Sequence, residues 1–198
     1  MKKLTTSLNK FLLSVLLFVA GTTLQAKELA GLSIEEQVSI AGMSTPLKLN
    51  GAGIRYKFFF TIYVGALYLS KPQSDAASIL KSDQPNRISM HFLYDEVPKK
   101  KLVNAWVDGF SDNTDKAGYA AVKSRLETFN QMFSDAHKGD VVLLDYLPGT
   151  GTRVSIKGEE KGVIEGADFN RALLSVWLGD EPVTEELKDA MLGIIEEE

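Results

Sequence analysis

The segment from Leu49 to Leu69, LNGAGIRYKFFFTIYVGALYL, constrains the fold more than any other part of the 198-residue chain. Its long aromatic and β-branched run is typical of a strand that is buried on at least one face. We interpret Gly51 and Gly53 as a turn that delivers Arg55 to the head of a strand reaching Leu69. An arginine at the head of so apolar a strand requires either a buried counter-ion or an anionic ligand.

The first 26 residues have the pattern of a secretory signal peptide. Three lysines give a positive start, an apolar run follows from Phe11 to Ala20, and Leu24-Gln25-Ala26 matches a cleavage site. The run is shorter than the roughly 20 apolar residues that a membrane-spanning helix needs, and no later run is long enough. We therefore expect one exported domain over residues 27–198, located most simply in the periplasm.

The composition excludes several classes of function. Without the three lysines of residues 1–26, the 22 basic and 26 acidic residues become 19 and 26, so the formal charge changes from −4 to −7. This balance argues against a nucleic-acid partner. The chain contains no cysteine, which excludes disulfides, thiolate catalysis and cysteine zinc sites. The histidines, His91 and His137, lack the spacing of a metalloprotease helix, so no metal is predicted. The glycine pairs at 51–53 and 149–151 complete neither a dinucleotide fingerprint nor a P-loop, so no cofactor is predicted.

The order of the predicted elements indicates an α+β fold with a largely antiparallel sheet covered by helices. A hairpin over 35–50 precedes the long strand, and a three-strand meander over 141–165 follows the middle helices. The other predicted elements are a short helix from an N-cap at Ser74 to about Ser82, a strand over 87–93, a helix that begins at Pro98, and helices over 116–136, 167–178 and 184–195.

The two faces of the predicted long strand differ in polarity. Counting by two places Arg55 and Tyr63 on one face, together with a threonine and a glycine. The other face, from Tyr56 to Tyr68, is apolar apart from two hydroxyls, so we expect it to pack against the helices. The first face suits a pocket in which an arginine fork binds a carboxylate and a tyrosine adds a hydrogen bond. A structural ion pair is the alternative for Arg55.

Three other features are interpreted as structural rather than functional. The run Lys99-Lys100-Lys101 is typical of a solvated helix start, and His91 lies within a predicted strand. Trp106 and Trp177 occur at helical core spacing, which predicts packing.

Five short motifs occur in a fixed order along the mature chain, and they are GAGIR (51–55), TIYVGALYL (61–69), IEGADF (164–169), ALLSVWLG (172–179) and PVT (182–184). Together they resemble the chalcone isomerase family in its exported bacterial branch. The resemblance covers nearly all of residues 27–198. It implies an open-faced β-sandwich, in which a large antiparallel sheet is covered by a helical layer.

The resemblance also bears on activity. Plant isomerases of the family close a chalcone to a flavanone without a cofactor, using an arginine and a threonine on one strand and a tyrosine and an asparagine on a later helix. Arg55 matches the arginine. Tyr63 falls at the threonine, Val176 falls at a late substrate-contacting serine or threonine, and the helix after Pro98 has no tyrosine. These departures argue against chalcone cyclisation.

The non-catalytic plant branch of the family binds fatty acids through an arginine and a tyrosine on that strand. The resemblance therefore implies a periplasmic, non-catalytic protein that holds a small amphipathic carboxylate, such as a fatty acid, with Arg55 and Tyr63. Tyr68 is the second candidate, if a β-bulge shifts the register. The alternatives are a cofactor-free intramolecular lyase or isomerase acting on a chalcone-like unsaturated carbonyl compound, and an interaction module with a vestigial pocket. The sequence names no protein partner.

Overall fold

Two antiparallel strands, β4 (Leu47–Lys57) and β5 (Phe60–Leu69), form a hairpin in the sheet. The computed structural model describes residues 27–194, so the predicted signal peptide lies outside the described residues. The prediction of one continuous strand up to Leu69 is wrong, because β4 passes through both glycines and the chain reverses at Phe58 and Phe59. The aromatic run thus forms a turn, and the glycines lie inside a strand.

The position of α5 (Glu185–Met191) explains why β4 contains these glycines. A Cβ atom added at Gly51 would lie 2.0 Å from the carbonyl oxygen of Ala190, and one added at Gly53 would lie 2.5 Å from the Cβ atom of Ala190. Glycine within a strand is therefore required here because a helix backbone approaches it closely. Sequence alone does not distinguish this use of glycine from a turn.

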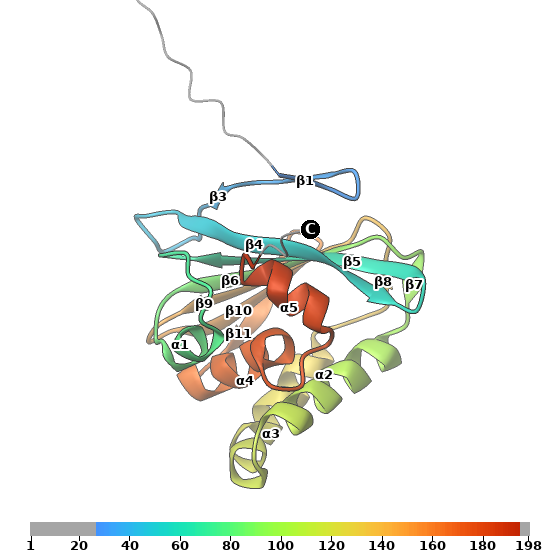
Figure 1. Cartoon of the computed structure of the whole chain (residues 1–198). Coiled ribbons are helices and arrows are strands. Elements are labelled where there is room, and N and C mark those ends of the chain that lie inside the picture. The colour runs from blue at the N-terminus through green and yellow to red at the C-terminus, as the bar shows by residue number, and fades with distance from the viewer. Residues whose placement is uncertain (1–26, 195–198) are drawn as a thin grey trace, which may run out of the picture.

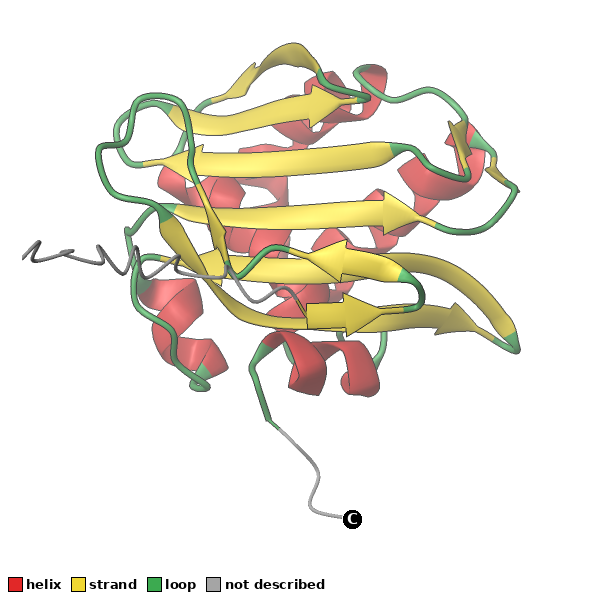
Figure 2. Ribbon diagram, turned by 90° about the horizontal axis from the view of Figure 1, so that it is seen from above, coloured by secondary structure: helices red, strands yellow, loops and turns green. Residues whose placement is uncertain are grey.

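Seven strands form one antiparallel sheet in the order β11-β10-β9-β6-β5-β4-β3, which is seen face-on in Figure 2. The pairing of Gln37 with Lys48 confirms the predicted hairpin over 35–50, and the pairing of β9, β10 and β11 confirms the predicted meander. The remaining strands of this sheet are β3 (Gln37–Val38), β6 (Asn86–Phe92), β9 (Val141–Leu147), β10 (Gly151–Ile156) and β11 (Glu159–Ile164).

The helices lie on one side of the sheet, as Figure 1 shows, which confirms the α+β fold with a helical layer. Asp75, rather than the predicted Ser74, caps α1, because its carboxylate accepts a hydrogen bond of 3.0 Å from the backbone amide of Ala77. The helices besides α5 are α1 (Ala76–Lys81), α2 (Lys99–Asn113), α3 (Lys116–Gln131) and α4 (Ala167–Leu178).

The opposite side of the sheet is covered by the N-terminal hairpin of β1 (Lys27–Leu29) and β2 (Leu32–Ile34) (Figure 1). Ile34 packs there with Val64 and Tyr68. The expectation that the Tyr68 face meets the helices is therefore wrong, since Tyr63 and Leu67 form the helix-facing side. Both faces of β5 are buried, so the polarity of alternate residues could not tell which face carries the helices. A small separate sheet pairs β7 (Glu96–Val97) with β8 (Ala136–His137).

The close approach of α5 to β4 gives a testable consequence. Gly53→Ala is expected to lower the free energy of unfolding by about 1–3 kcal/mol, because the new methyl group overpacks against Ala190. Urea denaturation measures this change. Adding Ala190→Gly removes the opposing methyl group, so the double variant should lose less stability than the sum of the two single changes. Additive losses would contradict this packing.

Candidate ligand-binding site

A cavity of about 330 Å³ lies between the free end of the β4–β5 hairpin, β6 and the helices. Its volume is in the range of small-molecule sites. The exposed lining residues, which include Lys57 and Phe58, mark its mouth. The apolar interior is lined by Ile62, Met90, Phe92, Leu102, Trp106 and Val176.

Arg55 and Tyr63 both line this cavity, because they lie directly opposite each other on β4 and β5. The sequence placed them on one face of a single strand, whereas the structure brings them together across a hairpin. A β-bulge contributes to this arrangement: Tyr56 pairs with Thr61 while Arg55 pairs with Tyr63, so Ile62 is the extra residue. The bulge lets Ile62 and Tyr63, although adjacent in sequence, both line the cavity.

Arg55 is half-buried and forms no ion pair with any residue between 27 and 194. Another arginine of the sheet differs in this respect. The Nε and Nη2 atoms of Arg87 lie 2.5 and 2.7 Å from the two carboxylate oxygens of Asp145 on the neighbouring strand. A structural ion pair, the alternative for Arg55, is therefore found at Arg87 instead.

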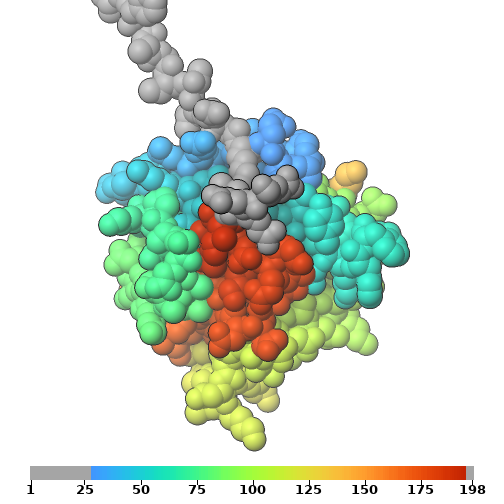
Figure 3. Space-filling view, in the orientation of Figure 1, coloured from blue at the N-terminus to red at the C-terminus, as the bar shows by residue number. Residues whose placement is uncertain are grey.

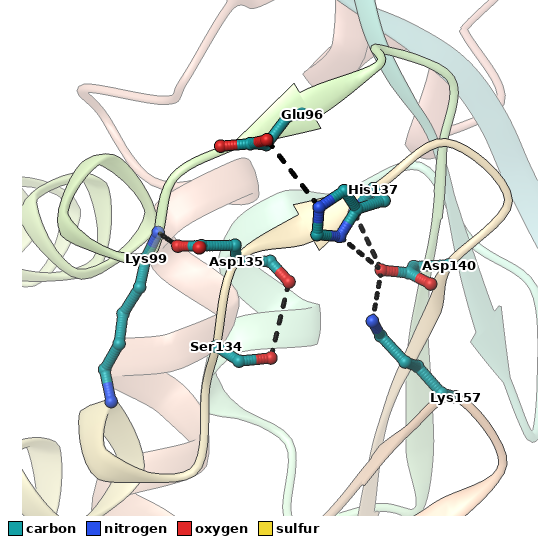
Figure 4. A network of polar contacts seen from close by, with 7 residues as sticks. All are labelled: Glu96, Lys99, Ser134, Asp135, His137, Asp140 and Lys157. Carbon is teal, nitrogen blue, oxygen red and sulfur yellow. Dashed lines mark hydrogen bonds and ion pairs between the residues drawn. The ribbon is translucent and has the colours of Figure 1, made fainter.

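Among the described residues that line the cavity, Glu96 is the only acid. Its Oε2 atom lies 3.7 Å from Nε2 of His137, and His137 lies in turn 3.8 Å from a carboxylate oxygen of Asp140, which Lys157 contacts at 2.9 Å (Figure 4). Glu96 thus belongs to a surface network around β7 and β8, and no ion pair between it and Arg55 is formed in the described structure.

Tyr63 is held as a neutral hydrogen-bonding group. Burial raises its pKa to about 12, although the indole of Trp177 and the charge of Arg55 both act to lower this pKa. The Tyr63 hydroxyl oxygen accepts a hydrogen bond of 3.0 Å from Nε1 of Trp177. Because the indole can only donate, the hydroxyl proton of Tyr63 remains available for a ligand.

Trp106 lines the cavity and carries a buried donor that sequence analysis missed. Its side chain is 3% exposed and its ring lies 5.6 Å from that of Trp177, but its Nε1 atom has no hydrogen-bond partner within the described part of the chain. Buried donors without a partner are uncommon in folded proteins. Helical spacing predicted burial correctly but carries no information about the partner of an indole nitrogen.

Tyr68, the second candidate from the sequence, lies away from the cavity. It is 3% exposed and packs beneath the N-terminal hairpin on the opposite face of β5. Without the bulge Arg55 would pair with Ile62, whose face of the strand includes Tyr68, so the bulge is what places Tyr63 instead on the side of Arg55. Residues 27–194 also contain no group of three or more histidine, aspartate or glutamate side chains that could hold a metal ion.

The fold and the cavity define an α+β protein with an internal apolar site between its sheet and its helices. A family model described as chalcone isomerase-like matches residues 26–193. The chain therefore belongs to the chalcone isomerase-like family, as its motifs indicated.

The chain is also similar to two known proteins, one by sequence and one by structure. It is 22% identical over 139 residues to Fatty-acid-binding protein 1 of Arabidopsis thaliana, which covers 65% of this chain and 50% of that protein. The chain thus spans about half the length of this relative. The crystal structure of a fatty-acid binding protein from Arabidopsis thaliana superimposes with a TM-score of 0.66 at 16% identity, covering 82% of this chain and 92% of that chain. At this identity the likeness establishes the fold.

The raised pKa of Tyr63 predicts a contribution to alkaline unfolding. The unfolded chain loses this proton near pH 10.0, whereas the folded protein keeps it to about pH 12. The resulting stabilisation is complete below pH 10 and is lost as the pH rises toward 12. In Tyr63→Phe the free energy of unfolding should therefore fall less steeply between these values, by about 1.4 kcal/mol per pH unit. Urea denaturation across this range tests it, with Tyr119→Phe on α3 as control. Equal slopes in wild type and Tyr63→Phe would contradict it.

Proposed function

We propose that the protein binds a fatty acid, or a similar small amphipathic carboxylate, without catalysing a reaction on it. The carboxylate contacts Arg55 and Tyr63, and the acyl chain occupies the apolar cavity. One observation carries this proposal above all: Arg55 lines an apolar cavity opposite a neutral tyrosine and has no carboxylate partner among the described residues.

The chemistry of the lining supports an amphipathic anion. A guanidinium group can bind both oxygens of one carboxylate, and the Tyr63 hydroxyl can donate to one of them. Such hydrogen bonds become strong once the bound ligand excludes water from the cavity. Beyond the polar end, residues such as Met90, Phe92 and Leu102 offer only apolar contacts. The names of both relatives, which state fatty-acid binding, agree with this ligand class.

We include Trp106 in the proposed site because a ligand oxygen would satisfy its unpartnered indole N–H. The free protein bears the cost of leaving this donor without a partner, about 1–3 kcal/mol for a buried polar group. Ligand binding removes that cost. The proposed polar end of the site therefore has three donors, on β4, β5 and α2.

A second candidate function is an isomerase or lyase acting on an unsaturated carbonyl compound. Arg55 and the neutral Tyr63 could together stabilise a developing enolate. The described lining offers no base close to them, since its one acid, Glu96, lies in the network with His137. Loss of chalcone absorbance on mixing, abolished in Tyr63→Phe, would favour this candidate over simple binding.

We also propose that the protein acts in the periplasm. The lysine-rich start, apolar run and cleavage pattern of residues 1–26 support this location. Cell fractionation combined with an intact-mass measurement tests both export and removal of these residues.

Arg55→Met is expected to weaken binding of dodecanoate by about 10- to 100-fold, because it removes the charge-assisted hydrogen bonds to the carboxylate. Isothermal titration calorimetry measures the affinity. Lys123→Met, which removes one exposed cation from α3, is the matched control and should bind as wild type. Dodecanol, which lacks the carboxylate, should bind equally weakly to wild type and Arg55→Met. Retention of dodecanoate affinity in Arg55→Met would exclude the proposed carboxylate contact.

Trp106→Phe is expected to weaken binding while costing little stability. Removing the buried unsatisfied donor offsets part of the cost of placing a smaller ring in the core, so the free protein should lose less stability than in a typical large-to-small core change. Affinity for dodecanoate should fall by about 5- to 10-fold, because one donor is lost. Thermal unfolding and calorimetry measure the two quantities on the same sample. A variant that keeps its affinity would remove Trp106 from the site.

A further inference from the structure

The free end of the β4–β5 hairpin exposes an unusual group of aromatic side chains. Phe58 and Phe59 are 85% and 87% exposed, and Tyr56 and Phe60 are 47% and 46% exposed. We call these four residues the aromatic tip. The hairpin forms the teal projection at the right-hand edge of Figure 3. Contiguous exposed apolar surface on a folded protein usually marks a site of interaction.

The backbone conformation at the tip is unfavourable for the residue that occupies it. Lys57 pairs with Phe60, so Phe58 and Phe59 form a two-residue hairpin loop. The φ angle of Phe58 is +56°, a conformation that favours glycine or asparagine in such loops. A bulky aromatic residue is strained there. The chain therefore keeps an apolar side chain at a position where a glycine would fold more easily.

Aromatic packing connects the tip to the rest of the protein. The ring of Phe59 lies 5.1 Å from that of Phe60, and the ring of Phe60 lies 5.4 Å from that of Tyr94 in an edge-on arrangement. Tyr94 lines the cavity. The exposed ring of Phe59 thus packs on Phe60, which packs in turn on Tyr94.

The tip also lies at the mouth of the cavity and beside positive charge. Phe58 and Phe60 line the cavity together with the three cations Arg55, Lys57 and Lys101, against a single described acid, Glu96. This local excess of positive charge contrasts with the formal charge of −4 for the whole chain. Exposed aromatic side chains next to lysines are the combination that binds the interface of an anionic lipid bilayer.

We propose that the aromatic tip docks the protein on the surface of a bilayer containing anionic lipids, with Phe58 and Phe59 inserted at the headgroup boundary. Docking places the mouth of the cavity against the membrane, and, if the proposed function holds, an acyl chain then passes between bilayer and cavity without crossing water. No helix within residues 27–194 has the length and hydropathy to span a membrane.

Vesicle sedimentation tests the docking itself. Wild-type protein should sediment with vesicles of mixed phosphatidylcholine and phosphatidylglycerol, and less with phosphatidylcholine alone or in high salt. Phe59→Ser should reduce the bound fraction at least fivefold, whereas Val163→Ser, at an exposed apolar residue of β11, should not. Intact mass must first show whether residues 1–26 are present, because their apolar run would bind lipid in every variant alike. Equal sedimentation of Phe59→Ser and wild type, or none by either, would overturn the proposal.

Phe58→Gly tests whether the strained turn lowers the stability of the fold while its side chain contributes to vesicle binding. This variant should unfold at a higher temperature than wild type, because glycine relieves the strained turn, and it should bind mixed vesicles less. Light scattering tests whether the aromatic tip instead contacts a second copy of the protein. A wild-type dimer that Phe59→Ser converts to a monomer, without vesicle binding by either, would make the tip an interface between copies and overturn membrane docking.

Transfer of a fluorescent fatty acid distinguishes this proposal from the proposed function. Phe59 does not line the described cavity, so Phe59→Ser should keep the solution affinity for the fatty acid while its uptake from vesicles slows at least fivefold. Uptake at the wild-type rate would exclude a part for the tip in transfer. If wild type binds vesicles but no fatty acid, the proposed function fails and the docking surface stands.

Discussion

The pairing of β4 with β5 determines most of what is distinctive in this protein. Its register places Arg55 opposite Tyr63, and its bulge adds Ile62 to the same cavity wall. The two-residue loop that closes the hairpin leaves Phe58 and Phe59 exposed, and Phe58 lies at the cavity mouth. Farther from the loop in β4, Gly51 and Gly53 leave room for the close approach of α5. One hairpin thus supplies Arg55 and Tyr63, part of the cavity wall and part of the cavity mouth.

Two arginines of the sheet, Arg55 and Arg87, differ in whether their charge is compensated within the described structure. Arg87 is neutralised by Asp145 across neighbouring strands, so its charge is already compensated when the protein folds. Arg55 is only half-buried, which keeps the cost of its uncompensated charge small while the cavity is open to water. A bound carboxylate would exclude that water and supply the missing charge. The same residue type therefore serves stability at one position and is available for binding at the other.

Sequence reasoning identified the fold class, the meander and most helices, and it placed Arg55 and Tyr63 on one face; their part in binding stays a prediction. The pair was found for a partly incorrect reason, because positions 55 and 63 share a face both on one straight strand and across this hairpin with its bulge. The reversal at Phe58 was missed because it lacks the glycine or asparagine that signals a tight turn. The donor character of Trp106 and Trp177 was missed because a hydrogen-bond partner depends on tertiary contacts that helical periodicity does not encode.

The contact of α5 with β4 also has a consequence for the order in which the polypeptide is completed. The amide of Asn50 donates to the carbonyl oxygen of Met191 at 2.8 Å, which joins positions 141 residues apart. This contact cannot form until Met191 has been synthesised, and contacts of this separation are slow to form. Until then, Gly51 and Gly53 lack the helix backbone that covers them in the folded protein.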